Sequence, residues 1–205
     1  MSTITMATQL TTSTVPNAPT EDSEVLAING TVVLVLGAPS APFKVRISED
    51  IIIFVSPVFE AMLSGPFVEG RQRSIQQPLE VSLPDDHVEA MMLLLRIMHH
   101  QDERVPERVE MPTLSHLVAL ADKYDCLGVV RKEVSVWIEC LRSSFSLYET
   151  AFPAISIAYK LRCEKLFESL TKEAIWNAKP PFWDPAKLAP GVCLVQELPR
   201  SFESM

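Results

Sequence analysis

The hydrophobic residues of this chain change their spacing partway along it, and this change constrains the fold more than any other feature. Three segments in the first half have the character of strands, at residues 31–36, 43–47 and 79–83. The first is a run of β-branched and aliphatic residues, and the other two alternate with a period of two. From Val88 onward, apolar residues recur every three or four positions. The sequence therefore predicts an α+β fold, a small sheet flanked by helices with a helical C-terminal half.

A run of five apolar residues lies between the second and third strand segments. Every side of a helix one and a half turns long is covered by Ile51, Ile52, Ile53, Phe54 and Val55. Such a segment has to bury more than one face, against its own core and against a partner. We therefore interpret these five residues as a candidate dimer interface.

Two short motifs indicate helix ends. They are Ser56-Pro57-Val58-Phe59 and Ala121-Asp122-Lys123-Tyr124-Asp125-Cys126. Ser56 has the chemistry of a helix N-cap and Pro57 that of the first helical position. We expect Phe59 to be anchored in the core and Tyr124 to close the apolar stripe of its own helix.

Composition along the chain divides it into four parts. Residues 1–24 are rich in Thr and Ser and lack an apolar period, so we expect disorder there. Residues 25–141 form the predicted domain, and residues 142–178 carry two further helical patterns. The tail at residues 179–205 is rich in proline, and we expect no regular structure in it.

The charge of the chain argues against nucleic acid as a partner. It has 26 Asp and Glu against 18 Lys and Arg, a net charge of −8. Neutralising a phosphate backbone needs clustered basic side chains. No window approaches the roughly 20 apolar residues of a membrane helix. We expect other proteins, and neither nucleic acid nor membrane, to be the partners.

The cysteines and the N-terminal residues indicate an intracellular protein. No Cys-x-x-Cys pair occurs among Cys126, Cys140, Cys163 and Cys193. This spacing is typical of reduced thiols and not of a disulfide framework or zinc site. The first residues lack a basic leader followed by an apolar core. The expected location is the cytoplasm or the nucleus.

No motif indicates a nucleotide site or a nucleophile. The segment at residues 65–72 has the glycine spacing of a phosphate-binding loop, but Pro66 removes an amide donor and Glu69 brings a negative charge. Cys126 follows a helix end, where the helix dipole raises a thiol pKa. No Gly-x-Ser-x-Gly elbow is present. We therefore expect no enzymatic activity, no catalytic residues and no cofactor.

The histidines and acids have structural interpretations. His99 and His100 are adjacent, so on a helix they point about 100° apart and do not face one metal ion. A helix C-terminus favours histidine through its dipole, which explains the pair. Asp86, with Glu89 three residues later, is typical of a capping box. No metal site is predicted.

Several motifs together resemble those of a BTB/POZ domain of the fungal type. The matching residues are Gly30 to Gly37, Phe43-Lys44-Val45, Ser56-Pro57-Val58-Phe59 with Met62-Leu63, Phe67-Val68-Glu69-Gly70, Leu83-Pro84-Asp85-Asp86, His99-His100, Val105-Pro106 and Ala121-Asp122-Lys123-Tyr124-Asp125-Cys126. Their order and spacing cover more than half of the chain. The helices of residues 142–178 look similar to the start of a BACK-like region.

The resemblance implies a protein-interaction module that forms homodimers and recruits other proteins. Many members of the family are adaptors for cullin-based ubiquitin ligases, and Phe67 and Glu69 occupy the place of the element that contacts the cullin. Two alternatives are a scaffold or transcription-associated regulator that uses the domain only for self-association, and a small enzyme with an unrecognised site.

Overall fold

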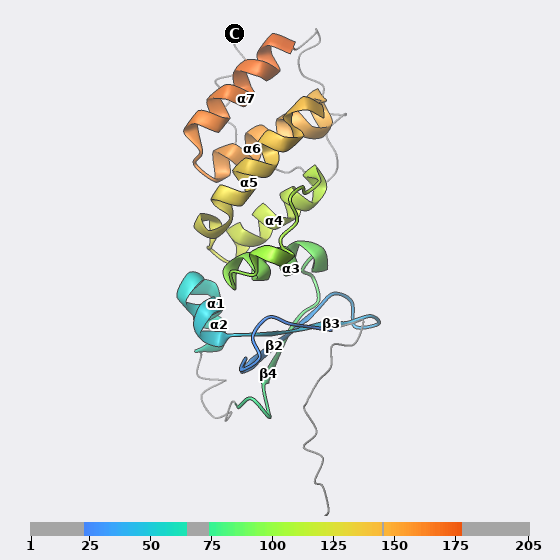
Figure 1. Ribbon diagram of the computed structural model, residues 1–205, viewed down its shortest axis with the longest axis vertical. Coiled ribbons are helices and arrows are strands. Elements are labelled where there is room, and N and C mark those ends of the chain that lie inside the picture. Colours follow the sequence, from blue (N-terminus) through green and yellow to red (C-terminus); the bar gives the residue numbers. More distant parts are fainter. Residues whose placement is uncertain (1–22, 65–73, 145, 178–205) are drawn as a thin grey trace, which may run out of the picture.

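Strand pairing in the first half of the chain builds a four-stranded sheet with the order β1-β3-β2-β4 (Figure 1). The strands are β1 (Ser23–Val25), β2 (Val32–Leu36), β3 (Phe43–Ile47) and β4 (Leu79–Leu83). The computed structural model describes residues 23–64, 74–144 and 146–177. Together with the helices, these strands give a mixed α+β fold, as the spacing of apolar residues predicts.

The hairpin of β2 and β3 is confirmed. The two strands are antiparallel and run in register from Val32 opposite Ile47 to Leu36 opposite Phe43. β2 is one of the two inner strands and is buried at four of its five positions, as a continuous apolar run requires. In β3, Val45 and Ile47 are buried while Lys44 is exposed. The sheet therefore has one face against the core, while its other face carries Lys44 and Glu80 beside Val33 and Val35 of β2.

The first strand was not predicted. β1 pairs with β3 in parallel, with Glu24 opposite Val45. Glu24 accepts hydrogen bonds from Arg96 at 2.7 Å and from Arg104 at 3.1 Å. Ser23 and Glu24, which the sequence places in the disordered segment, thus belong to a strand paired with β3. The predicted end of that segment at residue 24 is therefore wrong, and residues 1–22 lie outside the described residues.

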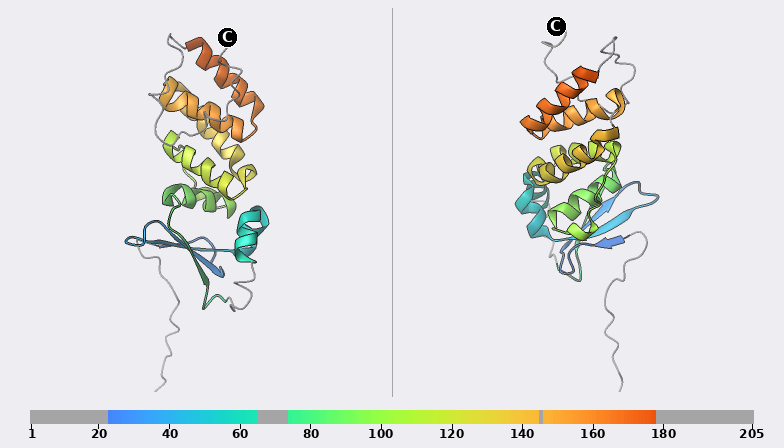
Figure 2. Two further views of the ribbon diagram at one scale, coloured as in Figure 1. Left: turned by 180° about the vertical axis from the view of Figure 1, so that it is seen from behind. Right: turned by 45° about the horizontal axis from the view of Figure 1, so that its top comes forward.

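Two short helices lie beside the sheet, and a longer helix covers its buried face (Figures 1 and 2). The short helices are α1 (Glu49–Val55) and α2 (Pro57–Leu63), and the longer helix is α3 (Val88–Met98). Eight residues of α3 are buried, including every residue from Ala90 to Leu95. The sequence predicts one apolar face here, but α3 lies between the sheet and the next helices and is therefore covered on several sides.

The remaining helices are stacked in succession away from the sheet, which gives the molecule its elongated shape (Figure 2). After the 3-10 turn η1 (Asp102–Arg104) they are α4 (Met111–Lys123), α5 (Leu127–Leu141), the short turns η2 (Arg142–Ser144) and η3 (Leu147–Ala151), α6 (Phe152–Lys160) and α7 (Glu164–Asn177). The core cluster is continuous from β2 to α7. The helical extension is thus packed on the domain through shared apolar residues.

Polar contacts reinforce this attachment of the extension. Lys160 of α6 forms an ion pair with Asp122 of α4 at 2.7 Å. Arg142 donates to Glu173 of α7 at 2.7 Å and also contacts Glu139 of α5 at 3.1 Å. The Lys160–Asp122 pair therefore joins α6 to α4, and the Arg142–Glu173 pair joins the end of α5 to α7, whereas Arg142 and Glu139 are three residues apart at the end of α5. Exposed pairs of this kind each contribute about 0–1 kcal/mol.

Candidate interaction surfaces

The two sequence motifs that indicate helix ends meet in the core. Ser56 is the N-cap of α2: its hydroxyl accepts from the amide of Phe59 at 3.1 Å and donates to the carbonyl of Tyr124 at 2.5 Å. The ring of Phe59 stacks on that of Tyr124, with centroids 4.3 Å apart and planes 2° from parallel. Ser56, Phe59 and Tyr124 are each fully buried. The cap, the first-position Pro57 and the core anchor Phe59 are confirmed.

Asp86 joins this cluster from a third part of the chain. Its carboxylate accepts from the Tyr124 hydroxyl at 2.5 Å and from Lys123 Nζ at 2.6 Å. Burial raises the pKa of Tyr124, as do the hydrogen bond to Asp86 and its charge, so the phenol remains a donor. The predicted capping role of Asp86 is wrong. The N-cap of α3 is His87, whose Nδ1 accepts from the amide of Ala90 at 3.3 Å.

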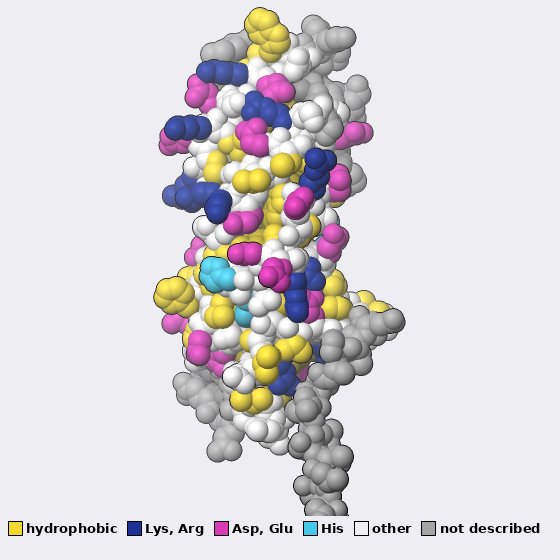
Figure 3. All heavy atoms as spheres, in the orientation of Figure 1, with side chains coloured by type: hydrophobic (Ala, Val, Ile, Leu, Met, Phe, Trp, Pro, Cys, Tyr) yellow, Lys and Arg dark blue, Asp and Glu magenta, His cyan; other side chains and the backbone are white. Residues whose placement is uncertain are grey.

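The apolar run Ile51–Val55 forms most of α1 and divides between core and surface. Ile52 is fully buried, and Ile51, Ile53 and Val55 are half-buried at the edge of the core. Phe54 is 91% exposed. The space-filling view shows a hydrophobic side chain projecting from the surface over α1 (Figure 3). The core of the described residues therefore covers only part of the run.

Several predicted functional residues lie outside the described residues. Phe67 and Glu69, the candidate cullin contact, fall in the gap between residues 64 and 74. The proline-rich tail at residues 179–205 also lies outside the described residues. The last described helix, α7, ends at Asn177, one residue before the predicted end of the helical extension at residue 178. The candidate cullin contact therefore stays a prediction.

His99 has a structural role that differs from the one predicted. It is buried at the end of α3, where its Nε2 accepts from the amide of Ser48 at 3.1 Å and its Nδ1 donates to the carbonyl of Leu95 at 2.8 Å. Burial lowers the pKa of His99, the Leu95 carbonyl opposes this, and His100 lowers it further. The favourable interaction of a charged histidine with the helix dipole is therefore the wrong explanation for His99, which is held neutral to link α3 to the start of α1.

Stability should consequently depend on pH through His99. A histidine whose pKa is lowered in the folded state contributes stability that is present above its unfolded pKa near 6.5 and is lost as pH falls through the folded pKa. We expect a lower free energy of unfolding at about pH 5.5 than at about pH 7.5. Urea unfolding of wild type, His99→Gln and His116→Gln measures this. The difference in the free energy of unfolding between the two pH values should shrink more in His99→Gln than in His116→Gln. His116 is a suitable comparison because burial also lowers its pKa. An unchanged difference in His99→Gln would contradict the assignment.

The three cysteines among the described residues lie in different environments. Burial, followed by the charge of Asp125, raises the pKa of Cys126 to about 12. The predicted direction of this shift is confirmed, but its main cause is burial, not a helix dipole, because Cys126 precedes α5 as its N-cap. Cys140 is exposed, and Cys163 lies near the Ser135 hydroxyl at 3.6 Å.

The described residues offer neither a cluster of metal-binding side chains nor a helix that could span a membrane. Within residues 23–64, 74–144 and 146–177, no three or more His, Cys, Asp or Glu side chains are grouped so as to hold a metal ion. Over the same ranges, none of the helices combines the length and the apolar character needed to cross a bilayer.

Comparison with known proteins gives no family assignment. No protein-family model matches this chain, and no curated protein matches it.

Proposed function

We propose that this chain is a protein-interaction module of the BTB/POZ type that self-associates through the outer face of α1. The resemblance in sequence supports the family, and so does the order of elements: a short strand, a hairpin, two short helices, a fourth strand and then helices only among the described residues. The contact of Ser56 and Phe59 with Tyr124 is consistent with both motifs being needed for one fold. An adaptor or scaffold role, with or without a cullin, follows from the same proposal.

The exposure of Phe54 carries the proposal. Phe54 is 91% exposed, and it is flanked on α1 by half-buried Ile53 and Val55, with which it forms a continuous apolar face. Burying a phenylalanine side chain stabilises an interface by about 1.5–3 kcal/mol. In a two-fold interface the same contact occurs twice, once from each copy. A second copy is therefore a suitable cover for this face.

A substitution at position 54 tests self-association. We expect Phe54→Ser to raise the dissociation constant of the dimer by more than about tenfold, because each 1.4 kcal/mol of lost binding free energy raises this constant tenfold. Sedimentation equilibrium of the full chain measures the constant. Trp176→Ser is the matched control, since Trp176 is a 90% exposed aromatic residue on the distant helix α7.

The control separates a specific interface from general hydrophobic adhesion. Trp176→Ser should leave the dissociation constant unchanged. A wild-type chain that stays monomeric at micromolar concentration would contradict the proposal. An equal rise of the dissociation constant in Phe54→Ser and Trp176→Ser would also contradict the proposal, because it would indicate adhesion without a defined interface.

A further inference from the structure

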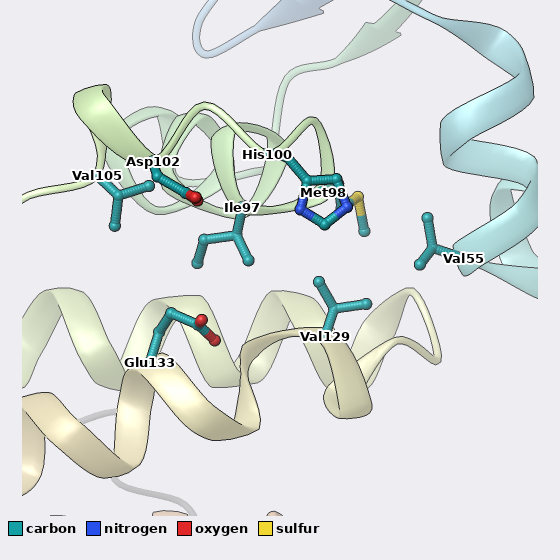
Figure 4. A pocket seen from close by; sticks show the side chains of 8 residues that line it. All are labelled: Val55, Ile97, Met98, His100, Asp102, Val105, Val129 and Glu133. Carbon is teal, nitrogen blue, oxygen red and sulfur yellow. The ribbon is translucent and has the colours of Figure 1, made fainter.

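A groove of about 420 Å³ runs between α3 and α5, with the end of α1 closing one side (Figure 4). Its floor is apolar: Val55 comes from α1, Ile97 from α3, and Val129 from α5. Val55 and Val129 are half-buried, so both are in contact with the core and open to the groove. Hydrophobic side chains are visible on the surface between α3 and α5 in the space-filling view (Figure 3).

Two carboxylates stand on opposite walls at one end of this groove. Asp102 belongs to the turn after α3, and Glu133 projects from α5 toward it (Figure 4). Neither carboxylate has an ion pair with any of the described residues. In contrast, Glu24 and Asp86 nearby in the fold are each paired with basic side chains. The end of the groove at Asp102 and Glu133 thus presents negative charge beside an apolar floor, and His100 lines the groove nearer to Val55.

This combination favours a basic occupant over a second copy of the chain. The exposed part of a second copy that would insert is α1 with α2, whose charged residues are Glu49, Asp50 and Glu60, with no Lys or Arg. Bringing these carboxylates to Asp102 and Glu133 would oppose like charges, which costs free energy at an interface. A Lys or Arg side chain placed between the two walls would neutralise the rim.

We propose that the groove binds a short segment of another protein in which aliphatic residues are flanked by Lys or Arg. The aliphatic side chains contact Val55, Ile97 and Val129, and a basic side chain lies between Asp102 and Glu133. Such a segment is the kind that an amphipathic helix presents when it lies in a hydrophobic groove. The groove meets the outer face of Phe54 at Val55, but Val129, Asp102 and Glu133 come from α5 and the turn after α3, so substitutions at these three residues test the groove apart from self-association.

A peptide-binding measurement on the full chain tests the proposal. The probe is a fluorescein-labelled peptide in which leucines at helical spacing alternate with arginines, and its control replaces every arginine by glutamate. Fluorescence anisotropy should show saturable binding of the arginine peptide, weakened by added salt, and no binding of the glutamate peptide. Val129→Thr should weaken binding about threefold, because it places a hydroxyl in the floor with little change in shape.

The isosteric double variant Asp102→Asn with Glu133→Gln should lower the affinity for the arginine peptide about five- to tenfold. This is the loss expected for two exposed charge contacts. Asp85→Asn with Glu164→Gln removes the same charge from exposed sites outside the groove and should leave affinity within about twofold. Both pairs keep side-chain shape, so folding is retained.

Three results would overturn the proposal. One is equal weakening by the groove and control double variants, which would indicate a general charge effect. Another is binding of the glutamate peptide as tightly as the arginine peptide. The third is a groove double variant that changes the sedimentation mass of the chain while the peptide fails to bind, which would assign the groove to a second copy.

Discussion

Phe59→Ala should lower the free energy of unfolding by about 3–5 kcal/mol, the range for removing a phenylalanine ring from a packed core. The ring is fully buried and stacks on Tyr124 at 4.3 Å, so its loss opens a cavity and removes an aromatic contact. Urea unfolding followed by far-ultraviolet circular dichroism measures the change. A loss of this size would leave little of the stability of an ordinary domain.

Two controls place this effect at the stacked ring. Phe59→Leu keeps most of the side-chain volume and should cost about 1–2 kcal/mol, the price of a shape change plus the lost stacking. Trp176→Ala removes an exposed aromatic side chain and should change the free energy by less than about 0.5 kcal/mol. If Phe59→Ala cost no more than Trp176→Ala, the core position of Phe59 would be wrong.

Asp86→Ala should lower the free energy of unfolding by about 2–3 kcal/mol, because it leaves the buried Tyr124 hydroxyl without an acceptor. The pair with Lys123 contributes less, since the Lys123 side chain is 51% exposed and can be solvated. The same urea measurement applies. Lys123→Met, which removes only the exposed partner, should cost less than about 1 kcal/mol.

A double-mutant cycle tests the hydrogen bond itself. Tyr124→Phe removes the donor, and combined with Asp86→Ala it removes both groups, so the double variant should lose less than the sum of the two single losses. Strict additivity would contradict the contact. Asp85→Ala is a neighbouring control, because Asp85 is exposed and should change stability by less than about 0.5 kcal/mol.

Local chemistry was sufficient to predict the elements that depend on neighbouring residues. The hairpin and β4 follow from spacing, and the start of α2 follows from Ser56 and Pro57, whose hydroxyl and fixed backbone angle act within one turn. The core position of Phe59 follows from the apolar residues around it. In each case the residues that determine the structure lie close together in the sequence.

Contacts between distant segments account for what sequence patterns did not show. β1 pairs with β3 about 20 residues away, and its Glu24 contacts Arg96 and Arg104, 72 and 80 residues away. Asp86 has a local pattern typical of a cap, but the Tyr124 hydroxyl 38 residues later is its partner. A periodic pattern carries no information about such pairs, so a strand of three residues and a buried carboxylate were both missed.

Of the two candidate surfaces, the face of α1 could be predicted from the sequence and the groove could not. Ile51–Val55 is conspicuous as a continuous run, and the structure leaves Phe54 of this run exposed. The groove was not predicted, because Val55, Ile97 and Val129 belong to three helices and no sequence pattern shows that these helices pack together. Only the packing of α1, α3 and α5 brings the three together beneath Asp102 and Glu133.

Amide hydrogen exchange of the full chain across a dilution series tests the central claim, self-association through α1, most directly. Exchange reports local opening, and an interface slows it only when the dimer is populated. We predict that the amides of residues 52–56 exchange more slowly at high than at low protein concentration in the wild type, and equally at both in Phe54→Ser. Exchange in α1 that is independent of concentration, or protection confined to α7, would contradict the account.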